Sequence, residues 1–199
     1  MSWPNRITLL RLLLVTPFIL LLLNAAEQPA YRYAAIALVT LIGICDAADG
    51  IVARRTGSIT RLGSVLDPLA DKALMISALV VLSFPGILSA DYPDFRLPYW
   101  VSVTLVSRDL FILVGTLITF FLVGFFQGLP SGTGKAATVM QFVTIVTTCA
   151  APDLLAWAPR ATHVGLIAVW SLAVALGVVS WLGYLRMGSK LLSAGESAD

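Results

Sequence analysis

The chain has 199 residues, of which 58% are hydrophobic and 12% are charged, and its mean hydropathy is +0.91. Soluble globular domains carry about 25% charged residues, so this composition excludes an ordinary soluble enzyme, a disordered segment and a disulfide scaffold. The formal net charge of +2 gives no indication of nucleic-acid binding. We therefore expect one integral membrane domain over residues 1–199.

A helix needs about 20 mostly apolar residues to cross a bilayer, and six stretches of the sequence meet this requirement. Charged and turn-forming residues separate the stretches, and no alternating strand pattern competes with them. The predicted spans are residues 7–23, 33–53, 63–84, 98–123, 136–157 and 164–185. The predicted fold class is an all-α integral membrane bundle of six transmembrane helices. Arg6 and Arg11 leave open a short interfacial segment before the first span.

The basic residues are divided unevenly between the two ends of the predicted helices. Six spans place both termini on one side, and that side contains Arg6, Arg11, Arg54, Arg55, Arg61, Lys135, Arg186 and Lys190. The opposite side contains Arg32, Arg96 and Arg160, together with Glu27, Asp91, Asp94 and Asp153. Because basic residues concentrate in cytoplasmic loops, we expect both termini and the 54–62 loop at the cytoplasmic face of the inner membrane.

Five aspartates lie inside or at the edge of the predicted spans, where a central charge costs about 2.5–3.5 kcal/mol to insert. Four of them bracket one short loop: Asp46 and Asp49 are three residues apart, and Asp67 and Asp71 are four apart. Both spacings put two carboxylates on one helix face. Clustered carboxylates repel or take up protons unless a cation binds, and oxygen ligands suit Mg²⁺, Mn²⁺ or Ca²⁺. The sequence therefore predicts a divalent-metal site.

Small residues accompany these aspartates. Gly50, Ala53 and Gly63 each lie beside an aspartate or about one helical turn from it. A helix face without side chains lets a partner approach the backbone closely, and in membranes that partner is commonly another helix. Beside four carboxylates and Arg54, a phosphorylated ligand explains the small residues better than helix packing does.

Two other interpretations of the aspartates remain open. They could form salt bridges with the nearby bases Arg54, Arg55, Arg61 and Lys72, which leaves the matched spacings and the glycines unexplained. A divalent-cation transporter could use the same carboxylates, but transport sites usually lie near the bilayer midplane at broken helices. These aspartates are expected toward the cytoplasmic helix ends instead.

The pattern Asp46-x-x-Asp49-Gly50-x-x-Ala53-Arg54, eight residues, Gly63-x-x-x-Asp67-x-x-x-Asp71 resembles the complete signature of the CDP-alcohol phosphatidyltransferases. The resemblance implies a homodimeric six-helix bundle that transfers a substituted phosphate from a CDP-linked donor to an alcohol and releases CMP. It implies that the four aspartates hold two divalent ions, Mg²⁺ or Mn²⁺, with Ca²⁺ as an inhibitor or structural substitute, and that Asp71 is also the general base. The residues that it assigns to the CDP site are Gly50, Ala53, Arg54 and Gly63.

The acceptor alcohol depends on cations elsewhere in the bundle. Arg108 in the predicted fourth span and Lys135 before the fifth are candidates to bind an acceptor phosphate. The alternative for Arg108 is an ion pair with the adjacent Asp109, which would neutralise both charges.

Within the family resemblance, the Asp-Pro-x-Ala-Asp-Lys of residues 67–72 is typical of phosphatidylglycerophosphate synthases and of cardiolipin synthases that use CDP-diacylglycerol. Ser107-Arg108-Asp109 followed by Lys135, Thr138 and Gln141 is more similar to the cardiolipin synthases. The second arginine typical of phosphatidylglycerophosphate synthases is replaced by Thr116. We therefore expect phosphatidylglycerol, a singly charged phosphodiester, as the acceptor, and glycerol 3-phosphate as the alternative.

Overall fold

The computed structural model describes residues 3–56, 63–123 and 132–196, and describes side chains for residues 10, 12–45, 69–70, 72–118 and 132–186. All regular secondary structure in these ranges is helical, as the sequence predicts. The helices are α1 (Trp3–Leu23), α2 (Pro29–Thr56), α3 (Gly63–Val81), α4 (Tyr99–Val123), α5 (Gly132–Trp157) and α6 (Pro159–Glu196).

Most of the helices extend beyond the predicted spans because hydropathy marks only their apolar part. α2 and α6 both begin at a proline, Pro29 and Pro159, a residue suited to the first helical turn, where its missing N–H is not needed. The prediction of a loop up to Lys135 is wrong at its end, since α5 begins at Gly132. α1 is one continuous helix from Trp3 to Leu23, so Arg6 and Arg11 lie within this helix and not in a separate segment before it.

α3 ends earlier than predicted, at Val81 instead of residue 84. The backbone N–H groups of Ser83 and Phe84 donate to the carbonyls of Val80 and Val81, which tightens the end of the helix into a turn. Pro85 follows, and it cannot continue a helical hydrogen-bond ladder.

Three helical segments of the described residues are long and apolar enough to cross a membrane: Tyr99–Ile118, Gly132–Trp157 and Pro159–Arg186. Shorter apolar segments lie in the other three helices, at Leu12–Leu23, Pro29–Cys45 and Lys72–Val81. The described helices are therefore those of a membrane protein. Crossing by all six helices remains a prediction.

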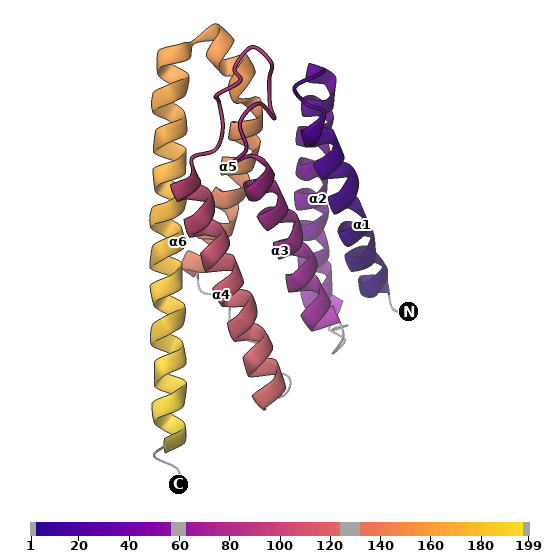
Figure 1. The fold of residues 1–199 in the computed structure, drawn as a ribbon. Coiled ribbons are helices and arrows are strands. Elements are labelled where there is room, and N and C mark those ends of the chain that lie inside the picture. Colours follow the sequence, from indigo (N-terminus) through magenta and orange to yellow (C-terminus); the bar gives the residue numbers. More distant parts are fainter. Residues whose placement is uncertain (1–2, 57–62, 124–131, 197–199) are drawn as a thin grey trace.

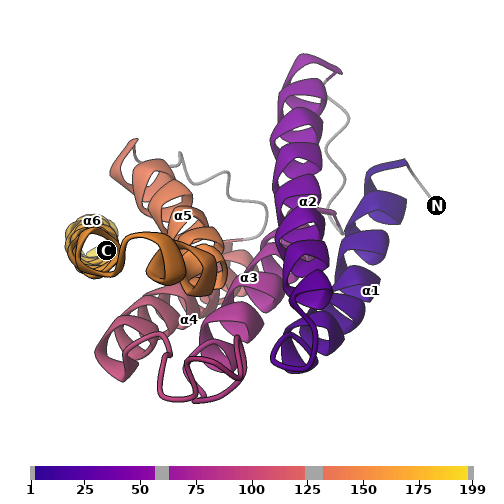
Figure 2. The same ribbon diagram turned by 90° about the horizontal axis from the view of Figure 1, so that it is seen from above.

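The helices run alternately up and down the bundle (Figure 1). Both chain termini, the end of α2 and the start of α3 lie at one end, which we call the signature end. The α1–α2, α3–α4 and α5–α6 junctions lie at the other, which we call the opposite end. Viewed along the bundle, α3 is central (Figure 2) and packs against α1, α4 and α5, while α5 also contacts α2 and α6.

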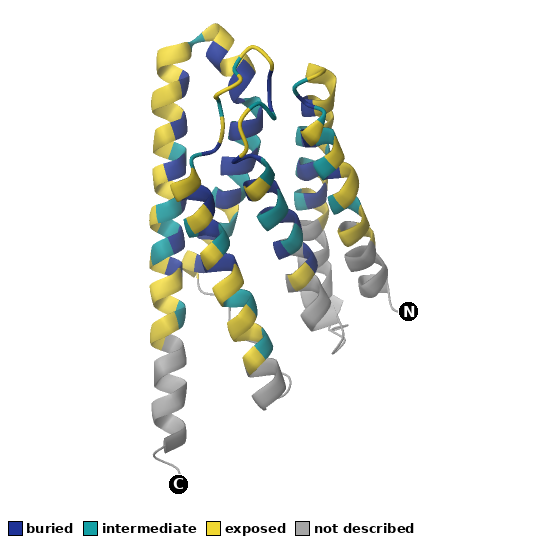
Figure 3. Ribbon diagram, viewed as in Figure 1, coloured by how far each residue is buried: buried dark blue, intermediate teal, exposed yellow. Residues whose placement is uncertain are grey.

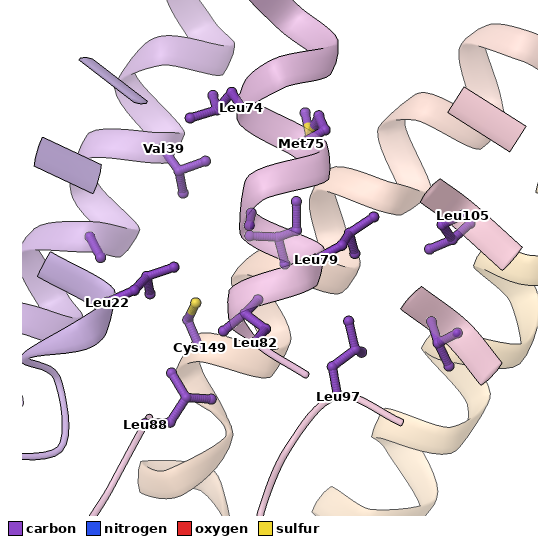
Figure 4. Packing of buried hydrophobic residues seen from close by; sticks show 14 of the residues in the cluster. Leu22, Val39, Leu74, Met75, Leu79, Leu82, Leu88, Leu97, Leu105 and Cys149 are labelled. Atoms are coloured by element: carbon purple, nitrogen blue, oxygen red, sulfur yellow. The ribbon is translucent and has the colours of Figure 1, made fainter. Parts of the chain in front are cut away.

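The core consists mainly of aliphatic side chains from all six helices and the α3–α4 connection. Leu22, Val39, Leu79, Leu82 and Leu97 are fully buried and gather around α3 in Figure 4. The outward faces of the helices are exposed (Figure 3) and rich in large apolar residues. An apolar exterior of this extent suits contact with lipid.

α2 and α5 approach closely at Gly43. A Cβ atom at this position would lie 2.9 Å from Cε2 of Phe142 on α5. The missing side chain thus lets the Phe142 ring rest on the backbone of α2, a common use of small residues between membrane helices.

A buried arginine ties three segments together at the opposite end. Arg32 of α2 is 3% exposed, and its Nη2 lies 2.5 Å from Oδ1 of Asp153 on α5. Its Nη1 donates to the carbonyl of Leu88 in the α3–α4 connection, at 3.0 Å. The Tyr33 hydroxyl donates to the same Asp153 oxygen at 3.0 Å, so this carboxylate serves two partners from one helix.

Candidate active site

The predicted metal ligands lie on two helices at the signature end. Asp46 and Asp49 belong to the second half of α2, and Asp67 and Asp71 belong to the first half of α3. Both helices are continuous through these positions, which satisfies the condition for each pair to share a helix face. The four side chains lie outside the described residues, and among the described side chains no group of three or more His, Cys, Asp or Glu residues gathers.

The predicted CDP-binding residues lie on the same two helix ends. Gly50, Ala53 and Arg54 fall in the last two turns of α2, and Gly63 is the first residue of α3. Their side chains are also outside the described residues. The helices therefore bring the whole signature to one end of the bundle, and its carboxylate donors fit hard divalent cations.

The described side chains contain a second polar group in the interior, which we call the Asp109 cluster. It consists of Lys72 on α3, Arg108 and Asp109 on α4, Gln141 on α5 and Ser180 on α6. All five residues are less than 9% exposed, and Asp109, Gln141 and Ser180 are fully buried.

Asp109 accepts hydrogen bonds from three helices, counting its own. Lys72 Nζ lies 2.9 Å and Arg108 Nη1 lies 2.7 Å from its Oδ1. Gln141 Nε2 donates to its Oδ2 at 2.7 Å. Charge-assisted hydrogen bonds of this kind are stronger than neutral ones, and they compensate a carboxylate that is costly to bury alone.

Arg108 forms the ion pair with Asp109 that the sequence left open as an alternative to acceptor binding. Its Nη2 also donates to Ser180 Oγ at 3.1 Å and to the Gly134 carbonyl at 3.3 Å. Lys135, the other predicted acceptor residue, follows Gly134 in the first turn of α5 and is exposed. The two predicted acceptor cations therefore lie near each other at the start of α5. Arg108 reaches this point from α4 and is buried in an ion pair, whereas Lys135 is exposed to solvent.

Sequence reasoning missed the contacts of Lys72 and Gln141 with Asp109. The sequence indicates Lys72 as a partner of the signature aspartates and as the last residue of the Asp-Pro-x-Ala-Asp-Lys motif, and Gln141 as part of a motif, without connecting either to Asp109. One feature of the sequence could have indicated these contacts: Lys72, Asp109 and Gln141 all lie within apolar spans, where polar residues rarely face lipid and usually pair with one another. Which residues pair could not be read from spacing, since Lys72 and Asp109 are 37 residues apart.

A helical bundle with an apolar exterior, an apolar core and a few charged groups buried among its helices is typical of an integral membrane protein with a functional polar site. The family model for CDP-alcohol phosphatidyltransferase matches residues 1–182, and the chain belongs to this family. It is therefore a phosphatidyltransferase of phospholipid biosynthesis. Members of this family generally use divalent metal ions, in agreement with the carboxylate signature. Family membership also favours an enzyme over a cation transporter.

Three proteins of similar sequence are named for two different activities. A Mycobacterium tuberculosis protein named "Probable phosphatidylglycerophosphate synthase" is 33% identical over 187 residues, covering 91% of this chain and 78% of that protein. An Aquifex aeolicus CDP-diacylglycerol–glycerol-3-phosphate 3-phosphatidyltransferase is 26% identical over 205 residues, covering 96% and 98%. A Streptomyces coelicolor cardiolipin synthase (CMP-forming) is 34% identical over 112 residues, covering 56% and 48%.

Proposed function

We propose that this phosphatidyltransferase uses CDP-diacylglycerol as donor and phosphatidylglycerol as acceptor, forming cardiolipin and releasing CMP. The observation that supports this acceptor is the ion pair between Arg108 and Asp109. Glycerol 3-phosphate approaches two negative charges, whereas the phosphodiester of phosphatidylglycerol carries one. Asp109 offsets one of the two buried cations that contact it, Arg108 and Lys72. The smaller net positive charge that remains suits a singly charged phosphate better than a doubly charged one.

The second candidate acceptor is glycerol 3-phosphate. The names of the M. tuberculosis and A. aeolicus relatives favour it, and both of those similarities cover more of this chain than the similarity to the S. coelicolor cardiolipin synthase does. In that case Lys135, exposed at the start of α5, would provide the additional positive charge.

The roles of the signature residues follow from the charge of the donor. Asp46, Asp49, Asp67 and Asp71 hold two divalent ions, Mg²⁺ or Mn²⁺, which when bound neutralise the diphosphate and stabilise the departing CMP. Arg54 pairs with remaining phosphate charge, and Gly50, Ala53 and Gly63 let the nucleotide approach the helix backbones.

Asp71 takes the proton from the acceptor hydroxyl during attack. The hydroxyl oxygen forms a bond to the phosphorus that carries diacylglycerol, and the bond from that phosphorus to CMP breaks. Lys135 orients the phosphate of the acceptor, while Arg108 stays buried in its ion pair with Asp109. The acyl chains of the donor stay in the bilayer while its nucleotide reaches the signature end.

The membrane arrangement belongs to the same proposal. The protein is a homodimer in which each protomer crosses the membrane six times, with both termini and the signature end in the cytoplasm. The common position of the two termini in Figure 1 supports an even number of crossings. The excess of basic residues predicted at this end supports the cytoplasmic side.

A fluorescent reporter fused to the C-terminus is expected to fold and emit in the cytoplasm. A C-terminal tag that is accessible only from outside the cell would contradict this orientation.

The acceptor is tested by incubating the purified protein with CDP-diacylglycerol and one candidate acceptor at a time. Phosphatidylglycerol, glycerol 3-phosphate, inositol phosphate and serine form a suitable panel, and mass spectrometry identifies each lipid product. We expect cardiolipin from phosphatidylglycerol. Phosphatidylglycerophosphate as the main product would establish the second candidate, and CMP release with none of the four would refute both.

A further inference from the structure

Lys72 connects the signature to the buried Asp109 cluster. It directly follows Asp71 on α3, it is 8% exposed, and its ammonium group lies 2.9 Å from Oδ1 of Asp109 on α4. Successive residues of an α-helix are rotated by about 100° around its axis. Because Lys72 contacts Asp109 on α4, the rotation of α3 about its own axis is set. That rotation in turn sets the direction of the helix face that contains Asp67 and Asp71.

The partner of Lys72 is itself held on several sides. Asp109 also accepts hydrogen bonds from Arg108 and Gln141, and Arg108 extends the contacts to Ser180 on α6. α3, α4 and α5 thus meet at one carboxylate that is 0% exposed, and α6 is connected to it through Arg108. Electrostatic attraction is stronger in such a low-dielectric interior than in water. Asp109 is therefore held in place strongly enough to fix the position of the Lys72 ammonium group.

We propose that Lys72 and Asp109 are positioning residues: their ion pair fixes the rotation of α3 and thereby turns the Asp67–Asp71 face toward the carboxylates of α2. This inference rests on the proposed metal site. Neither residue touches the metal or the substrate in this role. A helix without the pair could rotate or shift along its neighbours, and the two carboxylate pairs would then no longer converge on the same ions.

Lys72→Met is the most informative variant, because the loss of charge and the loss of positioning predict opposite changes in metal affinity. Removing a positive charge beside Asp71 would by itself strengthen binding of a divalent cation. Losing the orientation of α3 would weaken it. The variant leaves Asp109 paired with Arg108 and Gln141, so the remaining buried charges are still compensated.

The experiment measures Mn²⁺ binding to the purified full-length protein in detergent, by the electron paramagnetic resonance signal of free Mn²⁺, without substrate. We expect Lys72→Met and Asp109→Asn to weaken Mn²⁺ binding at least tenfold, and Lys72→Arg to stay within threefold of the wild type. Asp153→Asn is the matched control, because it also removes a carboxylate charge beside a buried arginine, but at the opposite end. It is expected to lower the thermal midpoint, by less than Asp109→Asn does because the Asp153 side chain is 43% exposed, while leaving Mn²⁺ binding unchanged.

The outcomes separate this inference from the function on which it depends. If the wild type binds Mn²⁺ and Lys72→Met binds it equally well or more tightly, the positioning role is refuted and the metal site stands. If Asp153→Asn weakens binding as much as Asp109→Asn does, the effect is general destabilisation, which also refutes it. If the wild type binds no Mn²⁺, the proposed metal site is wrong, and the inference falls with it.

Discussion

Replacing Asp71 with asparagine is expected to abolish CMP release while largely preserving CDP-diacylglycerol binding. Asparagine keeps one oxygen at this position but cannot take a proton from the acceptor hydroxyl. General bases contribute about 10²–10⁴-fold to enzymatic rates, and Asp71 is in addition a proposed metal ligand. We therefore expect the turnover of Asp71→Asn to fall by at least about 10³-fold. The measurement is CMP release at saturating donor and acceptor, alongside equilibrium binding of the donor.

Asp94→Asn is the matched control for Asp71→Asn. Asp94 is an exposed aspartate in the α3–α4 connection, at the opposite end of the bundle from the signature (Figure 1). The same change of side chain there is expected to leave both turnover and donor binding at wild-type values. Turnover of Asp71→Asn within tenfold of the wild type would remove this residue as the base. Loss of donor binding in parallel with turnover would instead indicate that Asp71 mainly holds the donor.

Removing divalent ions with EDTA is expected to reduce CMP release to background. The donor diphosphate is anionic and repels an incoming oxygen nucleophile, and the departing CMP carries further charge. Without cations to neutralise these charges, Arg54 is the only basic residue of the signature that faces them in our proposal. Adding Mg²⁺ or Mn²⁺ in excess over the chelator is expected to restore the rate. CMP release is measured before chelation, after chelation and after each addition.

A thermal melt of the chelated protein serves as its control, since loss of activity through unfolding would not be reversed by added metal. The interior contacts described above involve no metal ligand, so we expect the apo protein to remain folded. CMP release at an unchanged rate in EDTA would refute the metal assignment. Restoration by Ca²⁺ to the same rate as Mg²⁺ would contradict the expectation that Ca²⁺ inhibits or only substitutes structurally.

The helices are the part of the fold that the sequence predicts well. Each of the six apolar stretches corresponds to one helix, because apolar runs of this length between polar breaks leave few alternatives in a membrane. The boundaries were less accurate. α6 continues through Arg186 to Glu196 and α5 starts at Gly132, because hydrogen bonding within a helix does not stop where the apolar surface stops.

The family signature was also readable from the sequence alone, since its residues are close together in the chain and their spacing determines which of them share a helix face. Partners that belong to different helices were not readable. Lys72 and Asp109 are 37 residues apart, and Arg32 and Asp153 are 121 apart. The sequence by itself thus determined the family, the helices and the order of the signature residues. Only the tertiary structure decided that Asp109 pairs with both Lys72 and Arg108, because the partner of a buried charge depends on how the helices are rotated and packed.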